Sequence, residues 1–76
     1  MNNDRRKIVK DSVQKLVEAR EMLNTAIQTE STALSNIKTR GGSSERYEKV
    51  DEIVSSLKEA ADNLDEALSS LKEFDY

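Results

Sequence analysis

The feature that most constrains this chain is a single break in an otherwise uninterrupted helical pattern. Proline is absent from all 76 residues, so no residue forces a helix to end. The one strong break is the Gly-Gly-Ser-Ser run at 41–44, because glycine favours the left-handed position that ends a helix and serine favours the cap that begins one. The sequence therefore predicts one domain, residues 1–76, with helices over about 4–39 and 44–74 and a turn at 40–43.

Apolar residues recur at alternating spacings of three and four, the heptad pattern in which positions a and d form the packed seam. The seam of the first segment is Val9, Val13, Leu16, Arg20, Leu23, Ile27, Glu30, Leu34 and Ile37. The seam of the second is Tyr47, Val50, Val54, Leu57, Ala61, Leu64, Leu68, Leu71 and Asp75. Folding at the glycines pairs an a with a d position in every layer. We predict an all-α fold, an antiparallel two-helix hairpin with coiled-coil packing.

Two polar residues, Arg20 and Glu30, interrupt this seam. Long charged side chains commonly extend along apolar surface to the edge of a helix pair, which places the charge in water. A polar seam residue can also fix the register of a coiled coil, or form an ion pair across a dimer. Both interpretations stay open from the sequence, and the first is favoured.

A second apolar surface is expected along one flank of the seam, at position g. Its residues are Ala19, Ala26, Ala33, Ile53, Ala60, Ala67 and Phe74. The other flank, position e, is polar apart from Val17. Small side chains allow helices to approach closely, so a second copy packed on this flank would form a homodimeric four-helix bundle. The alternatives are a different protein partner, or alanines that only tighten the hairpin.

Acidic residues gather on the outer side of the second segment. They are Glu45, Glu52, Glu59, Asp62, Glu66 and Glu73, five of them at position f, which faces solvent in a coiled coil. The ordinary interpretation is a solubilising face. The alternative is a docking ridge for the basic cleft of a nucleic-acid enzyme, although the net charge of the chain is only −3.

The residues that most enzymes and metal sites need are missing. The chain has no cysteine and no histidine, which removes thiol nucleophiles, thiolate sites and imidazole bases. Its glycine pair lacks the lysine of a phosphate-binding loop. No apolar run approaches the roughly 18 residues that span a bilayer, and the start does not resemble a secretory signal. We expect a cytoplasmic protein that is not an enzyme, with no cofactor, metal, small-molecule substrate, membrane contact or direct nucleic-acid binding.

These observations favour a non-enzymatic protein–protein interaction module. We expect a small regulator, adaptor or inhibitor whose partner is a second copy of itself, a larger protein, or both. One alternative is an acidic decoy, of the kind that phages and other mobile elements encode, which occupies the basic cleft of a nucleic-acid enzyme. The other is a structural coiled-coil spacer whose length is its function.

Overall fold

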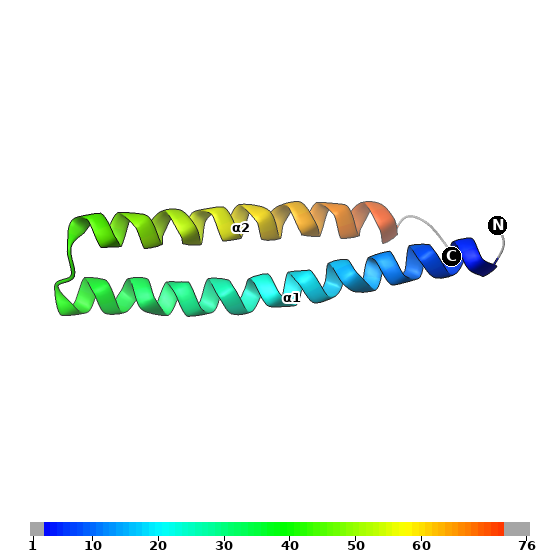
Figure 1. The fold of residues 1–76 in the computed structure, drawn as a ribbon. Helices are drawn as coiled ribbons and strands as arrows, with labels where there is room; N and C mark the ends of the chain where they lie inside the picture. The colour runs from blue at the N-terminus through cyan, green and yellow to red at the C-terminus, as the bar shows by residue number, and fades with distance from the viewer. Residues whose placement is uncertain (1–2, 73–76) are drawn as a thin grey trace.

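A computed structural model describes residues 3–72, which form two long helices joined by a short turn (Figure 1). Helix α1 is Asn3–Arg40 and helix α2 is Ser44–Lys72. The helices lie side by side and antiparallel, so the start of α1 lies at the same end of the hairpin as the end of α2 (Figure 1). The predicted all-α antiparallel hairpin is confirmed. The predicted end of the second helix at residue 74 lies outside the described residues.

The glycine pair ends α1 in the way that the sequence predicts. Gly41 has a φ of +72°, the left-handed conformation that glycine adopts without the steric cost of a Cβ atom. The N–H of Gly42 then donates to the carbonyl oxygen of Ile37 at 2.9 Å, which is the backbone bond of a Schellman motif. A Cβ atom on Gly42 would lie 2.6 Å from Cγ2 of Ile37. Both positions therefore require glycine, for different reasons.

Ser43 caps the start of α2. Its Oγ accepts a hydrogen bond from the backbone N–H of Arg46 at 3.2 Å, and its carbonyl oxygen accepts the first helical bond, from the N–H of Tyr47, at 3.1 Å. An N-cap serine satisfies one of the backbone donors that a helix start leaves without a partner. The turn is thus closed by its own residues, which sets the two helices side by side.

The core is a narrow seam between the helices. Ile37, Val54 and Ala61 are the buried residues, and every other described residue assigned to position a or d is half-buried. This burial confirms the heptad assignment along both helices. Ala61, 2% exposed, is the most deeply buried of the three.

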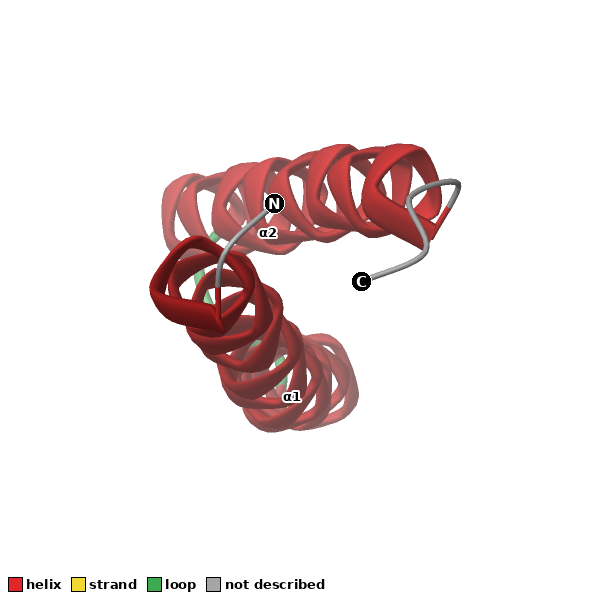
Figure 2. Cartoon of the chain, turned by 90° about the vertical axis from the view of Figure 1, so that its right-hand side faces the viewer, coloured by secondary structure: helices red, strands yellow, loops and turns green. Residues whose placement is uncertain are grey.

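The hairpin is an elongated rod with no second layer. Its principal extents are 59 × 15 × 13 Å and its radius of gyration is 17.4 Å, against about 11 Å for a compact domain of this length. Seen from its open end, the described chain consists of the two helices alone, and no other element covers either flank (Figure 2). Neither α1 nor α2, as described, has a stretch long and apolar enough to cross a membrane.

Candidate functional site

The candidate interaction surface is the flank of the hairpin that carries position g of both helices. We call it the alanine face and define it by six of the seven predicted residues: Ala19, Ala26, Ala33, Ile53, Ala60 and Ala67. The five alanines are half-buried beside the seam, so they tighten the hairpin itself as well as lining its flank. Ile53 is exposed, with 46% of its surface accessible. The seventh predicted residue, Phe74, lies outside the described residues.

Two further apolar side chains extend this face. Met22 is 73% exposed and Ile8 is 67% exposed, and both occupy position c, which adjoins position g on the surface of a helix. Met22, for example, lies three residues after Ala19 and four before Ala26, the spacings that make helix neighbours. With Ile53, they are all the large apolar side chains that are exposed among residues 3–72. Every one of them lies on the same flank.

Sequence reasoning missed Ile8 and Met22 because it considered position g alone. Position c of the first helix carries the missing signal, since two of its five residues are large and apolar where solvent-facing residues are expected. We use the name extended alanine face for the alanine face together with Ile8 and Met22.

The charges of the hairpin are distributed away from this face. None of the fifteen aspartate and glutamate residues of the chain occupies a c or g position. Basic residues occur there only near the ends of the rod, Arg5 and Lys15 toward the open end and Arg40, Arg46 and Lys49 toward the turn. The middle of the face therefore carries alanine, serine, threonine, asparagine, methionine and isoleucine, and no charge.

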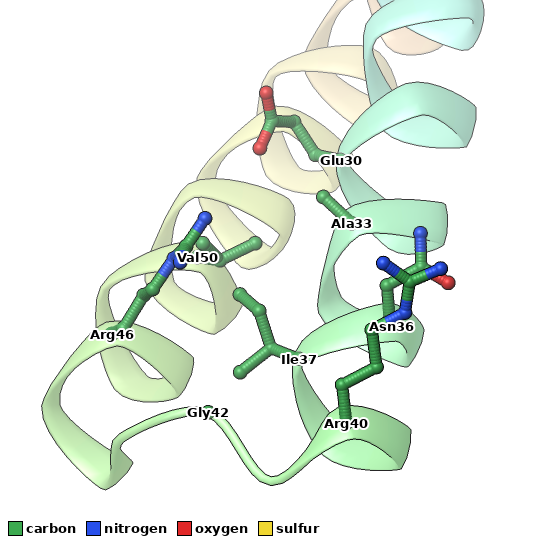
Figure 3. Close-up of a pocket in the computed structure, with 8 residues that line it drawn as sticks. All are labelled: Glu30, Ala33, Asn36, Ile37, Arg40, Gly42, Arg46 and Val50. Atoms are coloured by element: carbon green, nitrogen blue, oxygen red, sulfur yellow. The ribbon is translucent and has the colours of Figure 1, made fainter.

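A groove opens on the same flank where the helices meet the turn (Figure 3). We call it the turn-end groove; its volume is about 600 Å³ and its lining is Glu30, Ala33, Asn36, Ile37, Arg40, Gly42, Arg46 and Val50. Figure 3 shows Ile37 and Val50 facing each other across the gap between the helices, with Arg46 extending from α2 and Arg40 from α1. Within residues 3–72, no carboxylate lies within ion-pair distance of either guanidinium. The groove thus offers an apolar floor between two cations.

Glu30 brings the one carboxylate into this groove. It occupies a seam position, is half-buried, and projects from α1 toward α2 (Figure 3). The Glu30 side chain therefore extends to the edge of the seam, as predicted, on the flank that carries the alanine face.

A smaller groove lies on the opposite flank at the open end. Its lining is Val9, Lys10, Val13, Gln14, Val17, Leu68, Leu71 and Lys72, and its volume is about 370 Å³. Val17, the one apolar residue predicted at position e, joins the seam residues here to make an apolar depression with a lysine from each helix at its rim. The flank predicted to be polar is thus apolar over this part of its length.

Arg20, the other polar seam residue, reaches this opposite flank and pairs within the hairpin. Its Nε donates to Oδ1 of Asp65 at 2.7 Å and its Nη2 to Oδ2 at 3.0 Å, while Nη1 donates to Oδ1 of Asn24. The hydrogen bond from Arg20 lowers the pKa of Asp65, and the same bond raises the pKa of Arg20. The Arg20 side chain is 25% exposed and reaches Asp65 at the edge of the seam, which is the favoured interpretation of the sequence.

The predicted acidic ridge follows the outer side of α2. Glu45, Glu52, Glu59, Asp62 and Glu66 are all exposed, whereas Glu73 lies outside the described residues. Glu45 forms an ion pair with Lys49 at 3.8 Å; the remaining four have no such partner among residues 3–72. No cluster of acidic side chains in that part of the chain is suited to hold a metal ion. The ridge is therefore opposite in character to the extended alanine face, and the two surfaces adjoin at Glu52, which lines a shallow hollow together with Ile53.

Comparisons of the chain with protein-family models, with curated proteins and with solved structures found no match. What these surfaces can do is therefore argued from their own chemistry: the c and g positions of one flank are mostly apolar or small and hold no acidic residue, and the outer side of α2 is acidic and exposed.

Proposed function

We propose that this chain is a non-enzymatic protein-interaction module that pairs with a second copy through the extended alanine face, forming a four-helix bundle. The observation that carries the proposal is the position of Ile8, Met22 and Ile53, the exposed large apolar side chains among residues 3–72, on a single flank whose c and g positions hold no acidic residue. Isolated apolar residues on a surface need no explanation, but exposed apolar residues that gather on one side of a molecule are typical of an interface. A twofold axis brings the same patch of two copies together.

The surface area of the hairpin supports a partner of this size. The structure exposes 6039 Å², whereas a compact monomer of this mass exposes about 4,700 Å². The excess, about 1,300 Å², exceeds the roughly 800 Å² that each partner buries in a standard protein–protein interface. Pairing two rods along their length covers surface that a globular chain would bury within itself.

The composition of the face favours another helical layer over an extended peptide. Alanine and serine at positions c and g let two helices approach closely, while Met22 is a flexible side chain that fills irregular gaps. Both hairpins present two antiparallel helices, so their pairing gives the short-loop bundle architecture in which adjacent helices run in opposite directions.

In such a bundle the acidic ridge stays on the outside and remains accessible. We propose that the module acts there as a regulator, adaptor or inhibitor, binding a larger protein through Glu52, Glu59, Asp62 and Glu66. The lack of ion-pair partners for these four carboxylates supports this second surface, because unpaired charges are free to meet the basic cleft of a partner. The acidic decoy is thus the second candidate function, and it is compatible with self-association.

Substitution of the exposed apolar residues tests self-association with little cost to the hairpin. Met22→Glu and Ile53→Glu each place a charge on the extended alanine face at side chains that are largely outside the seam. Gln28→Glu and Ser55→Glu are the matched controls, since they add the same charge to exposed position b of the same helices. We expect sedimentation equilibrium to show that the two face variants lose association while the two controls keep the wild-type mass.

The proposal would be wrong if the face variants associated as strongly as wild type. It would also be wrong if all four variants lost association equally, because the effect would then reflect added negative charge and not the position of the face. Circular dichroism, measured at the same protein concentration for every variant, checks that each variant still forms helices.

A further inference from the structure

The turn-end groove is a concave site that no other segment of residues 3–72 fills. Its floor is apolar, from Ile37 and Val50, and its sides carry the guanidinium groups of Arg40 and Arg46 (Figure 3). The single carboxylate of its lining, Glu30, leaves an excess of one positive charge. This chemistry fits a segment that presents an apolar ring together with carboxylates, because aromatic side chains fill apolar pockets and arginine pairs strongly with carboxylates.

The chain itself contains one segment of this chemistry. Residues 73–76 read Glu-Phe-Asp-Tyr and directly follow the last residue of α2. Two carboxylates and two aromatic rings in four residues complement a groove with two arginines and an apolar floor. Such a run occurs nowhere else in the sequence, where the remaining aromatic residue is Tyr47.

The segment cannot reach the groove of its own hairpin. Helix α2 has 29 residues and is therefore about 43 Å long, and the groove lies at its beginning whereas the segment follows its end. Four extended residues span at most about 14 Å. Only a second copy can bring residues 73–76 to the groove, and only when its open end lies over the turn.

We propose that the turn-end groove of one copy binds residues 73–76 of a second copy, so that the turn of each hairpin lies over the open end of the other. This inference rests on the proposed function, the pairing of two copies through the extended alanine face. It selects one of the two twofold arrangements that such pairing allows, and it makes two equivalent grooves part of one interface.

The charges of the face support this arrangement. Turn-to-turn pairing would gather Arg40, Arg46 and Lys49 from both copies at one end of the bundle, and six like charges in close proximity are unfavourable. In the proposed arrangement the open end also contributes Arg5 and Lys15, but Glu73 and Asp75 accompany them there. Each pair of groove arginines thus meets two carboxylates of the partner.

Single cysteines test the arrangement, because the natural chain has none. Asn36→Cys places a thiol in the lining of the groove, and Tyr76→Cys places one beside Phe74 and Asp75, which are retained. Equal amounts of the two variants are mixed, unfolded together, refolded and oxidised slowly. We expect the main disulfide to join position 36 of one copy to position 76 of the other, as read by mass spectrometry after proteolysis. Gln14→Cys, exposed on the opposite flank, is the matched control and should not link to position 36.

A charge exchange tests the contact without cysteines. We expect Arg46→Glu to weaken the dimer about tenfold at low salt, and Arg46→Glu combined with Asp75→Arg to restore most of the loss, since the exchange re-forms an opposite pair in the same place. Arg6→Glu, at an exposed position of the open end, is a control for the change in net charge.

The outcomes separate this inference from the proposal that it rests on. A dimer whose main disulfide joins position 36 to position 36, or in which Asp75→Arg gives no rescue, overturns the groove contact and leaves self-association standing. A chain that stays monomeric at every concentration overturns both.

Discussion

Arg20 and Asp65, 45 residues apart in the sequence, form a two-pronged ion pair that joins the helices near the middle of the hairpin. Nε and Nη2 of the arginine donate to Oδ1 and Oδ2 of the aspartate at 2.7 and 3.0 Å. Paired guanidinium and carboxylate groups of this geometry are directional as well as attractive. A slip of α2 along α1 by one heptad would separate these groups, so the pair contributes to the register that the seam residues also favour.

The pH dependence of stability should carry the signature of this pair. Arg20 lowers the pKa of Asp65 below its ordinary value of 3.8, so the unfolded chain binds the proton more readily than the folded one. The stabilisation is therefore fully present above pH 3.8 and is lost as pH falls through the lowered pKa. We expect Asp65→Asn to reduce the midpoint of thermal unfolding slightly at pH 7, and the difference from wild type to shrink as pH falls through the lowered pKa of Asp65.

Carboxyl chemical shifts measured by NMR provide the direct check on that pair. Asp65 should titrate below 3.8 in the wild-type chain and return toward its ordinary pKa in Arg20→Gln. An Asp65 pKa that is the same in both proteins would contradict the account of the pair.

The close approach of the helices at Ala61 should not tolerate a larger side chain. Ala61 is 2% exposed, and we expect Ala61→Leu to destabilise the folded state by about 1–3 kcal/mol because it overpacks the seam. Ser55→Leu, at an exposed position of the same helix, is the control and should have little effect. Urea unfolding followed by circular dichroism measures both. Equal stabilities for the two variants would mean that the helices are not in close contact at Ala61.

The two glycines of the turn should respond differently to substitution. Gly41→Asn should cost less than Gly41→Ala, because asparagine tolerates the left-handed conformation at φ +72° better than alanine, for which it costs about 1–2 kcal/mol. Gly42→Ala should destabilise through the clash of its Cβ with Cγ2 of Ile37. In Gly42→Ala combined with Ile37→Leu the cost of the alanine should be smaller, because the Cβ atom of leucine carries no second branch. Thermal unfolding at a fixed protein concentration measures all four. If Gly41→Ala matched Gly41→Asn, the Schellman ending of α1 would be in doubt.

Removing the charge of the acidic ridge should leave self-association intact. Glu52, Glu59 and Glu66 are exposed on the outer side of α2 and occupy position f, outside the c and g positions of the extended alanine face, so we expect their joint change to glutamine to give the wild-type mass in sedimentation. The same triple variant should lose binding to a protein with a basic cleft, and wild-type binding to that protein should weaken as salt is added. A loss of self-association in the triple variant would place the ridge inside the interface and contradict the proposed arrangement.

The fold follows from the sequence because its determinants are local and mutually consistent. The heptad spacing of residues such as Val54 and Ile37 specifies which sides of the helices pack, and Gly41 and Gly42 specify where the chain reverses. Both signals agree on one register, and the described ends of α1 and the start of α2 lie within a residue of the predicted bounds. The extension of the Arg20 side chain to the edge of the seam was the favoured prediction. Its pairing with Asp65 was not predicted, because Asp65 lies on the other helix and the contact depends on the exact orientation of both helices.

The surface was harder to predict, because exposure depends on how two helices turn toward each other. The alanines at position g were identified as a flank, and the structure places them there, half-buried. Met22 and Ile8 were overlooked, since position c is ordinarily polar and an isolated apolar residue there carries little information. The turn-end groove combines residues of both helices with Gly42, and only the three-dimensional arrangement brings Arg40 and Arg46 to the same apolar floor.

The mass of the wild-type chain in solution tests the central claim most directly. Sedimentation equilibrium over a wide range of concentrations, with helicity followed by circular dichroism on the same samples, measures association and folding together. We predict a particle of twice 8.6 kDa that loses helix as it dissociates on dilution, because each hairpin completes its apolar packing only with the other. A fully helical particle of 8.6 kDa at every concentration would contradict the proposed self-association.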